Sequence, residues 1–93
     1  MPRRERLEII TTILNICNAR GANKTKIVYQ ANLNFKNAGV YLDWLIKRGF
    51  LAKEGNIYRT TSSGLALLDS LKVLIPLINE EGDGSLTKAS SNA

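Results

Sequence analysis

The stretch that decides the fold runs from Asn23 to Gly49 and reads NKTKIVYQANLNFKNAGVYLDWLIKRG. Asn23 is a favourable N-cap, so a short helix is expected over residues 24–31. Residues 32–34, with the sequence Asn-Leu-Asn, follow as a tight turn in which two turn-forming residues flank one apolar residue. The last of these is a second N-cap and Gly49 is a favourable stop, so a longer helix is expected over residues 35–48.

At 100° per residue, the predicted helix 35–48 divides into an apolar half and a mixed half. The apolar half holds Phe35, Ala38, Tyr41, Leu42, Leu45 and Ile46. The mixed half holds Lys36, Gly39, Val40, Asp43, Trp44 and Lys47. We therefore expect the first set to face the core and the second set to face outward.

A β-hairpin is expected directly after this helix. Two short runs, residues 51–54 and 57–60, flank the dipeptide Gly55-Asn56, and a connection of this kind is typical of a two-residue hairpin turn. The order helix, turn, helix, hairpin is that of a winged helix-turn-helix.

A helix is also expected on each side of this unit. Residues 4–18 show apolar residues at helical spacing, with Gly21 placed where a C-cap glycine would lie. Residues 62–80 form a second apolar helix, in which Pro76 should cause a kink or an early end. The predicted fold is mainly α with a small β-hairpin, in the order α-α-α-β-β-α.

Composition excludes several kinds of site. The chain has 93 residues, 44% of them hydrophobic and 23% charged, so it forms one domain whose core buries only ~60–65% of the unfolded surface. Cys17 is the only cysteine and there is no histidine, which excludes an internal disulfide and a closed zinc site. We expect no metal or cofactor, and self-association as the source of additional burial.

The net charge of +5 is unevenly distributed. Residues 1–60 carry eleven basic and four acidic side chains, whereas residues 61–93 carry two basic and four acidic ones. A positive field favours phosphate-rich partners, although a basic surface that only maintains solubility would have the same composition. The longest apolar run, residues 73–78, is too short for a membrane span, and no secretory leader is recognisable. A cytoplasmic location without membrane contact is expected.

Several short motifs occur in one order along residues 7–75. They are TKI at 25–27, ANLN at 31–34, YL at 41–42 with Leu45, GFL at 49–51, Tyr58, Thr60, and Gly64 followed by LL at 67–68. Together they resemble the small archaeal winged-helix DNA-binding proteins, both the dimeric ten-kilodalton chromatin-type proteins and the related transcriptional regulators. The resemblance implies a winged helix that dimerises through its C-terminal helix and binds double-stranded DNA. Ser63 departs from the lysine usual in the family, and Pro76 lies in a shortened last helix.

Helix 35–48 would enter the major groove, whose width of ~12 Å admits one helix. Lys36 and Lys47 would contact phosphates or base edges, and Val40 a thymine methyl group. Asn37 has two interpretations, contact with adenine or support for the helix cap.

Two further residues of this helix keep more than one interpretation. Asp43 would pair with Lys47 four residues on, or accept a hydrogen bond from cytosine. Trp44 has three interpretations, a core, dimer or DNA contact, of which a packing contact in the dimer is the simplest.

Other elements would contact the DNA backbone. Lys24, Thr25 and Lys26 begin helix 24–31, where backbone N–H groups favour a phosphate. The candidates on the hairpin, which would act as the wing, are Lys53, Asn56 and Arg59. Such contacts fix the register of a protein on DNA without reading its sequence.

The surplus of apolar residues predicts a homodimer. The expected dimer contacts are Ile9, Ile13, Leu67, Leu71, Leu74, Ile75 and Ile78. The chain is divided accordingly into a DNA-binding domain (1–60), a dimerisation helix (61–81) and a disordered tail (82–93), which has almost no apolar content.

Two classes of function are expected and a third is not. The first is a dimeric, nucleoid-associated protein that binds double-stranded DNA, as a regulator of transcription or, alternatively, as an architectural chromatin protein. The second is a winged-helix module that docks onto other proteins of a transcription complex. An enzyme is not expected, because the chain lacks histidine, a nucleophile with a base, a glycine-rich phosphate loop and clustered carboxylates.

Overall fold

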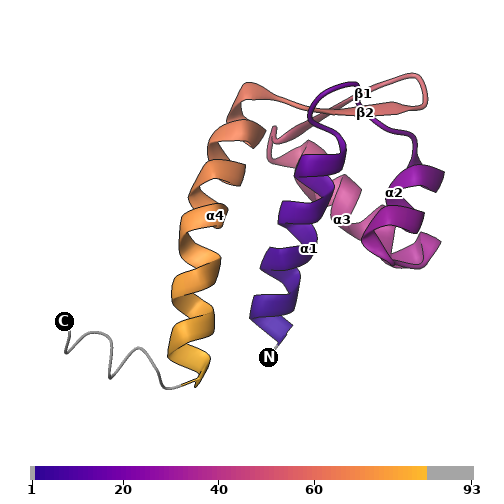
Figure 1. The fold of residues 1–93 in the computed structure, drawn as a ribbon. Coiled ribbons are helices and arrows are strands. Elements are labelled where there is room, and N and C mark those ends of the chain that lie inside the picture. The colour runs from indigo at the N-terminus through magenta and orange to yellow at the C-terminus, as the bar shows by residue number, and fades with distance from the viewer. Residues whose placement is uncertain (1, 84–93) are drawn as a thin grey trace.

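The computed structural model describes the backbone of residues 2–83 and the side chains of residues 5–77. The elements are α1 (Pro2–Ile16), α2 (Lys24–Ala31), α3 (Phe35–Lys47), β1 (Leu51–Glu54), β2 (Ile57–Thr60) and α4 (Ser62–Asp83). Figure 1 shows α1 and α4 side by side, α2 on the other side of α1, and the hairpin across one end. The predicted winged-helix order α-α-α-β-β-α is confirmed.

One apolar core joins all the helices and the hairpin. It consists of Ile10, Ile13, Leu14, Cys17, Ala22, Ile27, Leu42, Leu45, Leu51, Tyr58, Leu68 and Leu71. Since α1 lies between α2 and α4, its wide apolar arc has a partner on each side. The first half of α4 contributes to this core, so it belongs to the same folded unit as the elements before it.

The connection between α2 and α3 is fixed by local hydrogen bonds. The side chains of Asn23 and Asn34 each accept a bond from the backbone N–H three residues on, at 2.8 and 2.7 Å, as predicted for N-caps. Asn32 between them is left-handed (φ 57°), a conformation that asparagine tolerates. Leu33 N–H donates to the Val28 carbonyl at 3.0 Å. These contacts set the angle between the two helices.

Helix α1 differs from its prediction at both ends. The helix expected over residues 4–18 runs from Pro2 to Ile16, so Gly21 does not cap it. Gly21 has φ 79° and lies buried against β2, where a Cβ atom would approach the Tyr58 carbonyl oxygen at 2.9 Å. This glycine is needed for close backbone approach rather than for capping.

The end of α3 and the start of α4 are tied together. Gly49 (φ 82°) ends α3 as predicted, with its N–H donating to the Ile46 carbonyl at 3.0 Å. The Thr61 hydroxyl donates to the Gly49 carbonyl at 2.6 Å and accepts from the Gly64 N–H at 3.0 Å. Thr61 is therefore both the N-cap of α4 and its connection to α3.

Helix α4 is longer than predicted. It continues past Pro76 to Asp83 instead of ending early. Pro76 is exposed, whereas Leu71 and Ile75 hold the preceding turn against the core, so the loss of one backbone bond does not end the helix. The tail expected over residues 82–93 begins within α4, and residues 84–93 lie outside the described part of the chain.

Candidate nucleic-acid interface

Lys36, Val40 and Lys47, predicted to contact DNA, lie on the outward face of α3. Ala38, Leu42 and Leu45 are buried on the opposite side. Lys36 and Lys47 are exposed, and Val40 between them is 62% exposed. Asp43 is also exposed, but it does not pair with Lys47: among the side chains that the structure describes, the only ion pair lies on the hairpin.

The flank of α3 carries a cation–aromatic cluster. Trp44 is 40% exposed, and its ring centroid lies 6.1 Å from that of Phe50. The Arg48 guanidinium lies 5.0 Å from the Trp44 ring centroid, a distance at which the cation is attracted to the ring. Sequence reasoning missed Arg48, although counting 100° per residue places it beside Trp44.

Helix α2 presents Thr25, Lys26 and Tyr29 to solvent. Lys24 turns instead toward α3, where its Nζ lies 5.5 Å from the Phe35 ring centroid. Tyr29, which is 84% exposed, was not predicted as a contact. Its position four residues after Thr25 and three after Lys26 puts it on their face of the helix, a signal that the sequence contained.

The hairpin separates its two basic residues. Lys53 pairs with Tyr58 and Ala52 with Arg59 across the strands, so Lys53 and Arg59 lie on opposite faces. Lys53 Nζ lies 5.5 Å from the Tyr58 ring centroid, and Arg59 Nε lies 3.5 Å from Glu54 Oε1. One DNA phosphate therefore cannot contact both cations.

An open cavity of about 330 Å³ lies between the start of α2 and the hairpin. It is lined by Asn23, Lys24, Thr25, Lys53, Asn56 and Tyr58. A backbone bridge holds the two segments together: Ala22 N–H donates to Tyr58 O at 3.0 Å, and Tyr58 N–H to Ala22 O at 2.8 Å. The fold thus places residues of α2 and of the hairpin, both predicted to contact the DNA backbone, around one cavity.

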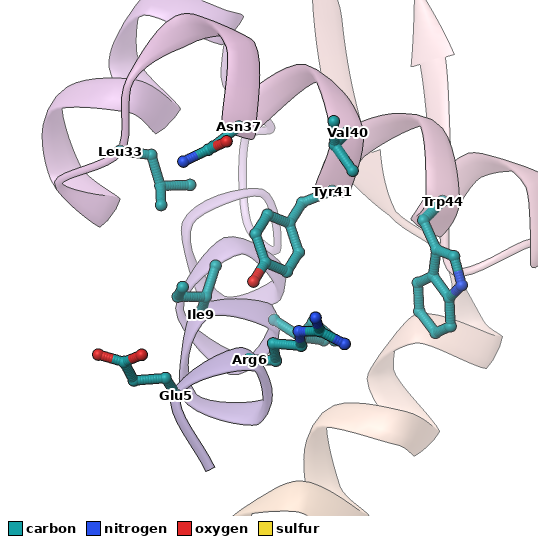
Figure 2. A pocket seen from close by; sticks show the side chains of 9 residues that line it. Glu5, Arg6, Ile9, Leu33, Asn37, Val40, Tyr41 and Trp44 are labelled. Carbon is teal, nitrogen blue, oxygen red and sulfur yellow. The ribbon is translucent and has the colours of Figure 1, made fainter. Parts of the chain in front are cut away.

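A second, larger groove lies between α1 and α3, with a volume of about 640 Å³. Figure 2 shows Tyr41 and Arg6 in its middle, Trp44 at one end, and Leu33 with Asn37 at the other. Ile9, predicted as a dimer contact, also lines it. Sequence reasoning did not foresee this groove, because it depends on how α1 and α3 pack.

The residues predicted for dimerisation lie in three kinds of place. Ile13 and Leu71 are inside the core of a single chain, at 0% and 3% exposure, so neither offers surface to a second copy. Ile9, Leu67 and Ile75 are half-buried against the same core, and Leu74 is exposed. The side chain of Ile78 lies outside the described residues.

Exposed apolar residues do occur on the far side of α4. Ala66, Val73 and Leu77 lie there together with the polar Ser70; the four recur at spacings of four, three and four residues, and all are exposed. This alternation is typical of a coiled-coil seam. Val73 is 64% and Leu77 48% exposed, so the seam includes large apolar side chains in contact with water.

Among the residues that the structure describes, three further features are the state of the Cys17 thiol, the grouping of metal-ligating side chains, and the length and polarity of the helices. Cys17 is buried, and loss of hydration raises the pKa of its thiol to about 11, so it is protonated and a poor nucleophile. The described side chains, those of residues 5–77, contain no cluster of three or more metal-ligating groups. The helices formed by residues 2–83 are also too short or too polar to cross a membrane.

Comparison with known sequences identifies the family. A family model described as winged helix-turn-helix matches residues 3–79. The chain is 35% identical over 79 residues to the uncharacterized protein MJ0287 of Methanocaldococcus jannaschii, a match that covers 85% of this chain and 81% of that protein. It is 33% identical over 76 residues to MJ0290 of the same organism, but spans only 36% of that protein.

Two solved structures are similar to this chain in fold. Sso10a-2, a DNA-binding protein from Sulfolobus solfataricus, is similar with a TM-score of 0.74 and 31% identity, covering 91% of this chain and 92% of that one. A MarR-family transcriptional regulator from Rhodococcus sp. RHA1 has a TM-score of 0.68 over 90% of this chain and 69% of its own. At 16% identity that likeness shows the fold alone. The resemblance to small archaeal winged-helix proteins is confirmed, and the chain belongs to the winged helix-turn-helix family.

Proposed function

We propose that the protein binds double-stranded DNA, with α3 in the major groove and the hairpin as a wing. The exposed face of α3 carries the proposal, because Lys36 and Lys47 flank an exposed Val40 there. Lysines can reach phosphates or guanine edges, and an apolar side chain can contact a thymine methyl. Support comes from Sso10a-2, which is similar over nearly the whole chain and is a DNA-binding protein.

The cavity between α2 and the hairpin is the proposed phosphate site. Lys53 and Asn56 approach it from the hairpin, and Thr25 approaches it from the start of α2. The cap and the helix use the backbone N–H groups of Lys26 and Ile27, which leaves those of the first two residues of α2 for a phosphate. Lys24 lines the same cavity, while Lys26 is exposed and supplies a further positive charge on α2. A phosphate bound there would fix the register of α3 on the duplex.

Arg59 contributes from the other face of the wing. Its pair with Glu54 is exposed, with 48% and 71% of the two side chains accessible. Surface pairs of this kind are worth ~0–1 kcal/mol, so a phosphate can replace the carboxylate at small cost. Arg59 therefore remains a proposed backbone contact, distinct from the one made by Lys53.

The proposed dimer forms through α4. The seam of Ala66, Ser70, Val73 and Leu77, with Leu74 beside it, is the exposed and mostly apolar surface that a second copy would cover. Burying this surface would stabilise the protein by ~25 cal/mol per Å² of apolar area. This burial would add to that of the core, which is small in a chain of this length. A dimer would also present two α3 helices to one duplex.

The proposed role is regulation of transcription by binding rather than catalysis, in the cytoplasm and in association with the nucleoid. An architectural role is the alternative, favoured by the same basic surface, since phosphate contacts carry no sequence information. Selection of bound fragments from random duplex DNA separates the two. An enriched palindrome would indicate a dimeric regulator, and an absence of enrichment an architectural protein.

The α3 proposal is tested by the double variant Lys36→Glu plus Lys47→Glu. The affinity of the wild type for DNA should fall steeply as the salt concentration rises. The variant should bind more weakly, and its slope of log K against log salt concentration should be smaller in magnitude by about 2. Fluorescence anisotropy with a labelled duplex measures both quantities.

The matched control is Arg20→Glu plus Lys72→Glu. It makes the same change in net charge at two exposed residues outside α2, α3 and the hairpin. Equal weakening of both double variants would contradict a specific role for α3. Undetectable binding of the wild type at ~50 mM salt, where such contacts are strong, would refute the function itself.

A further inference from the structure

The groove between α1 and α3 is not used by the proposed DNA contacts as a whole. Its volume of about 640 Å³ falls within the ~300–1,000 Å³ typical of small-molecule sites. Ile9 and Ile10 of α1 and Leu33 form its apolar lining. At its α3 side Val40 is 62% and Trp44 40% exposed to water, so an apolar ligand would be stabilised by covering their exposed parts.

The walls on the α3 side are flat. The Tyr41 ring and the Trp44 indole both line the groove, and aromatic faces favour planar partners in offset or tilted stacking. The structure shows no hydrogen bond from the Tyr41 hydroxyl or the Trp44 indole to any other described residue. The groove thus offers aromatic surface together with unused polar groups.

A cation lies at the same place. In the view of Figure 2, the Arg6 side chain extends toward the end formed by Trp44, whereas Glu5 lies below the opposite end, near Ile9. Among the described side chains, neither Glu5 nor Arg6 takes part in an ion pair. The guanidinium of Arg6 is therefore available to a ligand anion, for which its planar fork is well suited.

We propose that this groove binds a planar aromatic anion of about two fused rings. The rings stack on Tyr41 and Trp44, and the carboxylate or phosphate group of the ligand is held by Arg6. Both anions present the same pair of acceptor oxygens to a guanidinium, so the chemistry of recognition is shared.

The site is coupled to the proposed DNA contacts. Asn37 and Val40 line the groove and also belong to the set of α3 residues expected to contact bases. A bound ligand covers part of this set and adds negative charge next to it, which lowers the affinity for DNA. This regulatory consequence rests on the proposed function, whereas binding of the ligand does not.

Trp44 is the only tryptophan of the chain, so a ¹⁵N spectrum contains one indole N–H signal, and that signal comes from the groove. The full-length protein is titrated without DNA, with 1-naphthoate, 1-naphthyl phosphate and the uncharged 1-naphthalenemethanol. We expect a saturable shift with at least one anion, and binding at least tenfold weaker for the alcohol. Comparison of the two anions shows whether a carboxylate or a phosphate is preferred.

Substitution locates the anion. Arg6→Gln should weaken binding of the preferred anion at least tenfold, and Arg6→Lys by less, while the control Arg20→Gln leaves it unchanged because Arg20 does not line the groove. Both Arg6 and Arg20 are exposed, and circular dichroism checks that the variants stay folded. No saturable shift with either anion, equal binding of the alcohol, or no effect of Arg6→Gln would overturn the proposal.

A second measurement tests the coupling. The preferred anion should raise the dissociation constant for a duplex in the wild type and not in Arg6→Gln. Saturable binding with unchanged DNA affinity would refute the coupling. A protein that never binds DNA would refute the proposed function while leaving the titration result intact.

Discussion

Gly64 shows how one missing side chain allows two elements to pack. A Cβ atom at this position would overlap the Phe50 carbonyl oxygen and lie 2.7 Å from Thr60 Cγ2. The first turn of α4 can therefore approach the start of the hairpin only because residue 64 has no side chain. The backbone oxygen cannot move away without disturbing the end of α3.

We expect Gly64→Ala to lower the free energy of unfolding by about 1–3 kcal/mol, the usual cost of inserting a methyl group into a closely packed place. Denaturation with urea, followed by circular dichroism, measures the change. Gly39→Ala is the matched control: its Cβ would meet only the flexible Lys24 Nζ at 3.2 Å, so this variant should gain about 0.5–1 kcal/mol. Equal midpoints for the two variants would show that the overlap at Gly64 is unimportant.

At the scale of the elements, α4 has two faces with different expected roles. Leu71 is buried in the core of one chain, whereas Val73 and Leu77 are exposed on the seam. Leu71→Asp should unfold the protein, because an unpaired buried carboxylate is costly. Leu77→Asp should leave the fold intact and separate the proposed dimer.

Light scattering and circular dichroism test the seam together. The wild type should have twice the monomer mass at micromolar concentration, and Leu77→Asp the monomer mass with unchanged helix content. Lys72→Glu, another exposed position of α4 that lies off the seam, should stay dimeric. A wild type that scatters as a monomer would remove the dimer from the proposed function.

The sequence predicted the elements whose causes are local. Asn23 and Asn34 act as caps as expected, and the Gly55-Asn56 turn forms the hairpin. Ala38, Leu42 and Leu45 face the core as expected, because a spacing of 3.6 residues determines which side chains share a face. Phe35 was expected there too but is 53% exposed, since it lies at the first position of α3. Even the opposite orientation of Lys53 and Arg59 follows from a two-residue hairpin turn and was predictable.

Features that depend on packing between distant segments were not predictable. Gly21 resembles a helix cap in the sequence, and only contact with β2 reveals its actual role. Pro76 resembles a helix end, but packing of α4 on α1 carries the helix onward. Lys24 turns toward Phe35, although its position at a helix start suggested an outward side chain. Each difference reflects a tertiary contact that overrides a local preference.

At the scale of the whole molecule, Cys17 reports on the stability of the core. Burial raises the pKa of its thiol from 9.0 to about 11. Between these values the unfolded chain loses the thiol proton and the folded chain keeps it. The corresponding stability is therefore complete below pH 9 and is lost as the pH rises toward 11.

We expect this residue to lower the free energy of unfolding by about 2–3 kcal/mol across that range. To isolate the contribution of the thiol, the measurement is the difference between the wild type and Cys17→Ala at each pH. As the pH rises from 9 to 11, the free energy of unfolding of the wild type should fall relative to that of Cys17→Ala. A difference that is constant from pH 8 to pH 11, spanning the shift of the thiol, would show that Cys17 ionises as easily in the folded state.

The Thr61 hydroxyl joins the end of the helix proposed to enter the major groove to the start of the helix proposed to pair with a second copy. Hydrogen bonds of one side chain thus connect the two helix ends directly. In a dimer, the distance between the two α3 helices is then set by the alignment of the two seams. Dimers read half-sites ~34–36 Å apart, or multiples of that distance. The spacing between half-sites would thus be encoded in α4, so a substitution there could change which DNA is chosen without touching a base.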